Sequence, residues 1–305
     1  MTTPTVDRRA NLRAVALGVY AGALAFSVVT RGIPIEREQV LLWLLAGVIA
    51  ASIGSSWSTI ARAVRDWLLL GLLFLLYDFS RGAAEGLGMP VLVELPIDVD
   101  RMLFPGDVPT VELQQRWRPF TGERWWEALV SIVYVSHFIV PYVVTAVIWL
   151  RDRRVWRQWL ARFSTLTLAG LITYVLVPTM PPWLAARGGH LPPVERIAGR
   201  GWRRLELDVA ERALDKGQAA VNLVAALPSL HAAYPALIAT FFWSRAAPAW
   251  RPLLVAYPLA MGFTLVVSGE HYAFDVLVGW IYVAGVMVLW HHLDGTRRVR
   301  AWLDG

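Results

Sequence analysis

Eight apolar segments alternate with polar stretches along the chain. Their lengths lie at or somewhat below the roughly 20 residues with which a helix crosses a bilayer. A backbone inside a bilayer must satisfy its own hydrogen bonds, and a helix does so within one segment. The pattern therefore predicts an all-α polytopic membrane protein with about eight transmembrane helices. The predicted spans are Leu12–Thr30, Val40–Trp57, Trp67–Arg81, Ala128–Leu150, Phe163–Val177, His231–Ser244, Pro252–Ser268 and Phe274–His292.

Clusters of arginine predict the orientation of these spans. With eight spans, five clusters share one side: before the first span, in the three short loops after the second, fourth and sixth, and after the eighth. Short loops rich in arginine stay in the cytoplasm, so we expect both termini there. The two long loops, residues 82–127 and 178–230, then lie on the periplasmic or extracellular side of a plasma membrane.

The composition agrees with a membrane protein and excludes several functions. The chain is 56% hydrophobic and 17% charged, with a mean hydropathy of +0.48. Soluble domains are about 45–50% apolar and about 25% charged. There is no cysteine, so disulfides, thiolate metal sites and a cysteine nucleophile are excluded. The net charge of +6 forms no basic stripe on a soluble face, and we expect no nucleic-acid partner.

Two short polar motifs stand at the ends of apolar segments on the predicted outer side. They are Pro228–His231 and His271–Asp275. His271 and Asp275 are four residues apart, which places both side chains on one helix face. A carboxylate bonded to one imidazole nitrogen fixes the tautomer and makes the other nitrogen a better nucleophile. His231, at the same membrane depth, can protonate a leaving alkoxide.

The residue pattern alone leaves more than one interpretation open. Ser229 lies in a turn that begins with proline, where its hydroxyl and nearby amides can hold phosphate oxygens at a helix N-terminus. His231, His271 and Asp275 could instead form a zinc site or lie at the membrane interface without a function. Ionisable residues near membrane segments are costly, and this cost favours a functional interpretation.

The two motifs resemble the second and third signature motifs of the type 2 phosphatidic acid phosphatase superfamily, the third represented by Gly269–Asp275. The resemblance is closer to the inositol phosphorylceramide synthase-like branch and covers roughly Leu70–Leu289, whereas the first two spans are generic. The other positions that carry it are Tyr77-Asp78 with Arg81, Phe104-Pro105-Gly106, Leu113-Gln114, Tyr134 to His137-Phe138, Pro178–Trp183 and Asn222.

The resemblance implies a covalent phosphohistidine mechanism that uses neither a cofactor nor a metal ion. His271 would attack the phosphorus, Asp275 would orient His271, and His231 would protonate the departing group. Water or an acceptor alcohol would then take the phosphoryl group from the enzyme, with His231 acting as the base.

The sequence departs from the superfamily pattern where positive charge is expected. Leu265 stands in place of the arginine of the third motif, and Val111 replaces the basic residue of the first motif, although Arg118-Pro119 is present. Phosphate charge must then be neutralised by other cations. We expect Arg81 and Arg118 to bind phosphate, and Arg81 above all because it ends an apolar segment at the expected depth.

Two further polar residues complete the predicted substrate- and phosphate-binding set with Ser229. Glu270 stands next to the proposed nucleophile, where it either points away from the phosphate or binds hydroxyls of a polyol such as inositol. His137 lies within a predicted span and either supports the site or serves helix packing. No residue is assigned to a metal.

These expectations describe a membrane lipid phosphotransferase or phosphatase that acts on a phospholipid or lipid phosphate, with a polyol such as inositol as the acceptor. Two alternatives stay open: a simple phosphatase of lipid or isoprenoid phosphates, and a non-enzymatic lipid-phosphate carrier. Residues 1–65 would form a two-helix membrane segment, residues 66–293 a catalytic membrane domain with a six-helix phosphatase-like core, and residues 294–305 a cytoplasmic tail.

Overall fold

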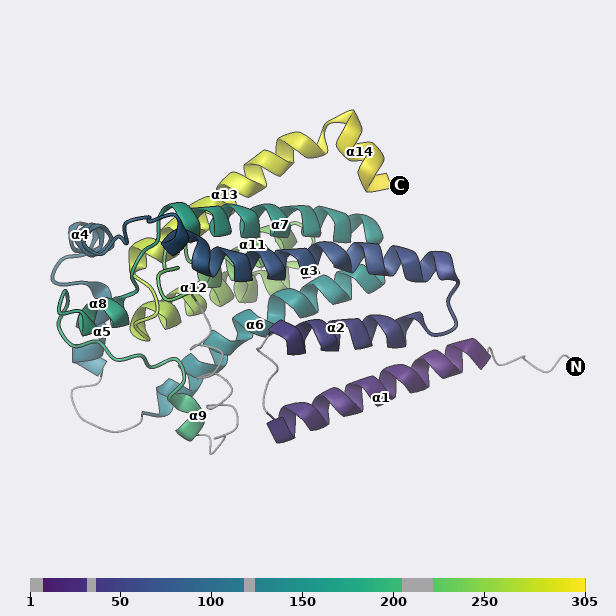
Figure 1. Cartoon of the computed structure of the whole chain (residues 1–305), viewed down its shortest axis with the longest axis horizontal. Helices are drawn as coiled ribbons and strands as arrows, with labels where there is room; N and C mark the ends of the chain where they lie inside the picture. The colour runs from purple at the N-terminus through teal and green to yellow at the C-terminus, as the bar shows by residue number, and fades with distance from the viewer. Residues whose placement is uncertain (1–7, 32–36, 118–123, 205–221, 305) are drawn as a thin grey trace, which may run out of the picture. The chain divides into compact units, whose positions relative to one another are not determined.

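Helices form almost all of the regular structure in the computed structural model, which describes residues 8–31, 37–117, 124–204 and 222–304 (Figure 1). No strand occurs within these ranges, so the all-α prediction is confirmed. The helices are α1 (Arg8–Arg31), α2 (Arg37–Ser52), α3 (Trp57–Gly86), α4 (Glu94–Leu103), α5 (Pro109–Trp117), α6 (Trp125–Arg151), α7 (Arg153–Leu176), α8 (Pro182–Arg187), α9 (Gly201–Arg204), α11 (Leu230–Phe242), η1 (Pro248–Trp250), α12 (Arg251–Val267), α13 (Ala273–Asp294) and α14 (Arg297–Asp304).

The chain divides into two compact units. The first comprises Met1–Leu76 with Leu207–Val221, and within it α1 packs against α2. The second comprises Tyr77–Glu206 with Asn222–Gly305 and contains both polar motifs. Because α3 runs through the division between the units, the boundary between residues 65 and 66 stays a prediction.

Each predicted apolar segment falls largely within one helix. Five described stretches are long and apolar enough to cross a membrane: they lie in α1, α6, α7 and α13, and in α12 with the preceding η1. The other three segments lie in α2, α3 and α11, which have 16, 30 and 13 residues. The structure thus supports a multi-pass membrane protein, whereas the count of eight spans stays a prediction.

Helix α7 begins ten residues before its predicted span, and its N-terminal cap explains the difference. The Asp152 side chain accepts hydrogen bonds from the backbone N–H groups of Arg154 (2.9 Å) and Val155 (3.0 Å). Such a cap satisfies amide groups that have no partner inside the helix. The polar start of α7 therefore continues into the apolar part without a break.

Helix α11 lies at the centre of the second unit and packs against α6, α7, α12 and α13 (Figure 1). Most of its side chains are buried, and four of the buried ones are alanines: Ala232, Ala233, Ala236 and Ala239. Small side chains allow helix backbones to approach closely, which is the usual basis of packing between membrane helices. The histidine at the start of α11 is thereby surrounded by protein.

The described parts of the two long loops, residues 82–127 and 178–230, pack together over one end of this bundle. A core of buried apolar residues joins α4, α5 and α8 to the start of α13; it includes Ile97, Val111, Trp183 and Tyr272. Isolated parallel bridges also connect Leu92, Thr179 and Ala225 in series. The described parts of the loops are therefore organised.

The starts of α11 and α13 approach each other at a glycine. A Cβ atom added to Gly279 of α13 would lie 2.6 Å from the carbonyl oxygen of Ser229, the residue that precedes α11. The backbone N–H of Ser229 also donates to the carbonyl oxygen of Asp275 at 3.1 Å. The distance between the two polar motifs therefore depends on the absence of a side chain at position 279.

This close approach predicts that Gly279→Ala disrupts the site. Overpacking of a tight interior costs about 1–3 kcal/mol, so we expect a lower melting temperature in detergent, measured by fluorescence-detected gel filtration. Gly285→Ala on the same helix is the control, because a Cβ there meets no atom within 4 Å. Equal melting temperatures for the two variants would contradict the packing argument.

Candidate active site

The structure brings His271 and Asp275 together at the start of α13. His271 Nδ1 lies 3.4 Å from Asp275 Oδ2, and the two side chains are 6% and 0% exposed. The contact is an ion-pair distance and His271 Nδ1 makes no hydrogen bond to a described residue; catalytic hydrogen bonds often tighten only when substrate is bound. The same Asp275 oxygen accepts the backbone N–H of Tyr272 at 3.0 Å. The carboxylate is thus held where it can orient the imidazole ring.

A tight turn between α12 and α13 sets the position of His271. The backbone N–H groups of Glu270 and His271 both donate to the carbonyl oxygen of Leu265, at 3.1 and 3.2 Å. Gly269 has a φ of 77°, a left-handed conformation that glycine adopts without strain. The turn therefore presents His271 just before Tyr272, the N-cap of α13, so His271 lies outside the helix whose face it was expected to share with Asp275.

His231 faces His271 from the first turn of α11. Their ring centroids are 5.5 Å apart. On its other side, His231 stacks on His137 of α6, with centroids 4.0 Å apart. Among the described residues, the buried His231 Nε2 and His137 Nδ1 have no hydrogen-bond partner. The structure thus places all three predicted histidines in one cluster.

Ser229 is the N-cap of α11 and connects the two motifs. Its hydroxyl accepts the N–H of Ala232 at 3.2 Å, and the residue is fully buried. Tyr174 of α7 holds the same turn by donating its hydroxyl to the carbonyl oxygen of Pro228 at 2.9 Å. Capping is therefore the role that the structure gives to Ser229, and phosphate binding by its hydroxyl stays a prediction.

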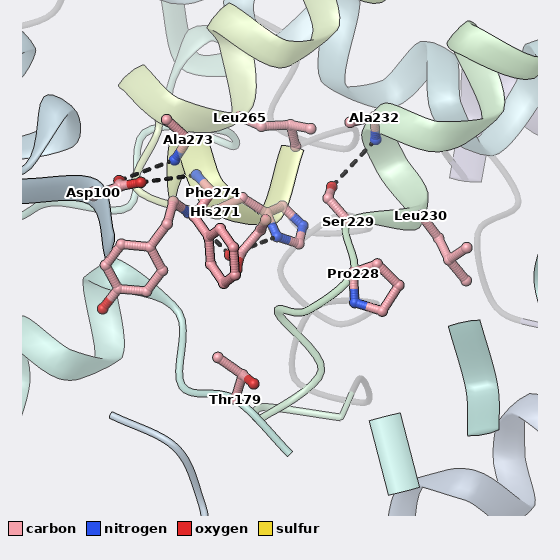
Figure 2. Close-up of polar contacts among 12 residues, drawn as sticks. Asp100, Thr179, Pro228, Ser229, Leu230, Ala232, Leu265, His271, Ala273 and Phe274 are labelled. Carbon is pink, nitrogen blue, oxygen red and sulfur yellow. Dashed lines mark hydrogen bonds and ion pairs between the residues drawn. The ribbon is translucent and has the colours of Figure 1, made fainter. Parts of the chain in front are cut away.

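Asp100, in the outer helix α4, is a site residue that the sequence did not reveal. Its carboxylate accepts the backbone N–H groups of Ala273 (3.0 Å) and Phe274 (2.8 Å), the first two residues of α13 (Figure 2). These amides have no partner within the helix, so Asp100 caps α13 from a distant part of the chain. No local spacing in the sequence predicts a contact between residues that are 173 positions apart.

Glu270 is paired with Arg196, a second residue that sequence reasoning missed. Arg196 Nε and Nη2 donate to the two carboxylate oxygens of Glu270 at 2.7 and 2.9 Å. Arg196 stands in the charged part of the second outer loop, and no motif distinguishes it there. Of the two expected phosphate ligands, Arg118 and the side chain of Arg81 lie outside the described residues. Their roles stay predictions.

The described residues contain no cluster of three or more histidine and acidic side chains with the geometry of a metal site. Instead, the His231 and His271 rings lie beside each other, and the Asp275 carboxylate lies beside His271. Whether the chemistry is independent of metal ions stays a prediction.

The residues of this site lie in a region that defines the family of the chain. A family model of the PAP2 superfamily matches residues 111–289, which is more than half of the chain and includes both motifs. The chain therefore belongs to the PAP2 superfamily, as its motifs indicated. Members of this superfamily are phosphatases, and membership indicates a phosphatase-type activity. Searches among curated proteins and among solved structures found no match.

The environment of Asp100 predicts a pH dependence of stability. Burial raises the pKa of Asp100 from 3.8 to about 6, although its bonds to Phe274 and Ala273 favour the ionised form. The folded protein then holds this proton more tightly than the unfolded chain. The stabilisation of the folded state by protonated Asp100 is therefore complete below about pH 4 and is lost as the pH rises through about 6.

We expect the stability advantage of the wild type over Asp100→Asn to be largest near pH 4 and to shrink by about 3 kcal/mol by pH 7. Melting temperatures in detergent across this range provide the measurement. Asp98→Asn, at an exposed position of the same helix, should change little at any pH. An advantage that grows with pH would show that folding lowers the pKa of Asp100, which would contradict the prediction.

Proposed function

We propose that this protein is a membrane enzyme that transfers a phosphorylated headgroup between a lipid and an alcohol through a phosphohistidine. The observation that carries the proposal is the position of His271, with the Asp275 carboxylate at 3.4 Å from Nδ1 and the His231 ring opposite. A nucleophile with an orienting carboxylate and a separate proton donor is the arrangement that such transfer requires.

In the first step, His271 Nε2 attacks the phosphorus of the lipid and an N–P bond forms. The bond between phosphorus and the lipid oxygen breaks, and protonated His231 donates its proton to that oxygen. Asp275 stabilises the positive charge that develops on His271 as its lone pair is shared. The products are a neutral lipid alcohol and a phosphohistidine that carries the headgroup.

In the second step, the hydroxyl oxygen of an acceptor attacks the phosphorus and the N–P bond breaks. His231, now neutral, takes the proton of the hydroxyl and is ready for the next cycle. Water as the acceptor gives hydrolysis, and an alcohol gives transfer. Neither step requires a metal ion, because the histidine is the nucleophile and the phosphate charge can be met by fixed cations.

The acceptor that we favour is a polyol such as inositol, and the donor a phospholipid or lipid phosphate. The motifs that resemble the inositol phosphorylceramide synthase-like branch support this choice over simple hydrolysis. The arginine distribution supports cytoplasmic termini and a site on the outer side of a plasma membrane. We also keep the substrate- and phosphate-binding set that the sequence predicts: Ser229, His137, Glu270, Arg81 and Arg118.

The proposal predicts the effect of replacing His271, His231 and Asp275. His271→Ala should lower turnover of a labelled phospholipid by about a thousandfold or more, since it removes the nucleophile. His231→Ala and Asp275→Asn should lower it by about a hundredfold or more. His292→Ala, an exposed histidine near the end of α13, is the matched control.

The same assay, run with and without inositol and with a chelator, identifies the reaction by its products. A headgroup transferred to inositol supports the proposal, whereas free phosphate or a released headgroup phosphate alone favours hydrolysis. Activity that is lost with the chelator would contradict the metal-independent mechanism. Lipid movement that survives in His271→Ala without any product would favour a carrier.

A further inference from the structure

Arg196 lies immediately beside the turn that carries the proposed nucleophile. It is bonded through two N–H groups to Glu270, the residue that precedes His271. The side chains of Arg196 and Glu270 are 22% and 7% exposed, so the ion pair is largely withdrawn from water. One positive charge is therefore placed beside the turn that carries His271.

The backbone on both sides of Arg196 is fixed by hydrogen bonds. Before it, the Gln114 side chain donates to the carbonyl oxygen of Glu195 at 2.8 Å and accepts the N–H of Glu195 at 2.9 Å. After it, the N–H of Ile197 donates to the carbonyl oxygen of Ser268 at 3.1 Å. Arg196 is thus held against the end of α12 by contacts that are independent of its own side chain.

Arg196 contacts an aromatic ring that a second arginine also contacts. The guanidinium carbons of Arg196 and Arg187 each lie 4.8 Å from the centre of the Trp183 ring. Trp183 is buried, whereas Arg187 is exposed at the end of α8. The two arginines therefore share one cation–π partner, but only Arg196 is paired with Glu270.

The position that carries the family's arginine is apolar in this chain. Leu265, labelled in Figure 2, is fully buried. Its carbonyl oxygen accepts the N–H groups of Glu270 and His271 in the turn. A phosphate group in such a partly dry site needs a fixed positive charge, because attraction between opposite charges strengthens as water is excluded.

We propose that Arg196 supplies this charge by binding phosphate oxygens at His271, and that Glu270 positions its guanidinium. The inference rests on the proposed phosphoryl-transfer function. A guanidinium has five N–H donors in a planar fork and can bond a carboxylate and a phosphate at the same time. The pair also gives a role to the acidic residue next to the proposed nucleophile, because both carboxylate oxygens of Glu270 are bonded to Arg196 and hold its guanidinium in one orientation.

The first test uses inorganic phosphate as a competitive inhibitor of lipid turnover. Arg196→Gln should raise the inhibition constant for phosphate and the KM for the lipid by about 10- to 100-fold, as expected for the loss of bonds to a charged group. Arg196→Lys keeps the charge and should restore part of the affinity. Arg187→Gln is the matched control and should leave both constants unchanged. Unchanged constants in folded Arg196→Gln would overturn the inference.

A second test needs no variant. Wild-type protein is treated with phenylglyoxal, which modifies arginine, in the presence and absence of inorganic phosphate, and modified peptides are measured by mass spectrometry. Phosphate should protect Arg196 by about tenfold and leave Arg187 unprotected. Equal protection of both arginines, or protection of neither, would overturn the inference.

These tests separate the inference from the proposed function. If His271→Ala retains turnover, the phosphohistidine proposal fails. The protection of Arg196 by phosphate still tests whether this arginine binds phosphate. If His271→Ala is inactive and Arg196→Gln binds phosphate like the wild type, the function stands and Arg196 is only a structural partner of Glu270.

Discussion

The contact between the first turns of α11 and α13 is the constraint on which the rest of the site depends. The Ser229 N–H bonds to the carbonyl oxygen of Asp275, and Gly279 allows the two backbones to meet. Interiors are packed at high density, so a change of one methyl group at such a contact moves both helices. His231 and His271 face each other only because this contact sets their separation.

The loops that contain α4 and α8 also hold the site in place. Asp100 caps the first amides of α13, and the apolar core around Ile97, Trp183 and Tyr272 fixes α4 and α8 in place. A buried carboxyl costs free energy unless it is hydrogen-bonded. The two bonds to α13 offset part of that cost and transmit the position of the loops to His271. The loops therefore help to position the candidate site and are not simple connections.

Much of the fold and part of the site could be predicted from the sequence. Apolar length located the predicted spans, and the short separation of His271 and Asp275 predicted that the two side chains lie close together. His271 nevertheless precedes α13, which begins at Ala273, so the expected common helix face was wrong. The pairing of Arg196 with Glu270 and the cap formed by Asp100 could not be predicted. Both join residues that are more than 70 positions apart in the chain, and no periodicity connects such positions.

The sequence by itself determined the helical membrane architecture, the two motifs and the nearness of His271 to Asp275, because each depends on local spacing and on transfer from water to an apolar medium. Only the tertiary structure decided that His271 stands before α13, that His137 stacks on His231, that Ser229 caps α11 and that a charged pair occupies the turn beside His271. Those features depend on which faces of distant helices meet, and close packing selects that arrangement from all side chains at once.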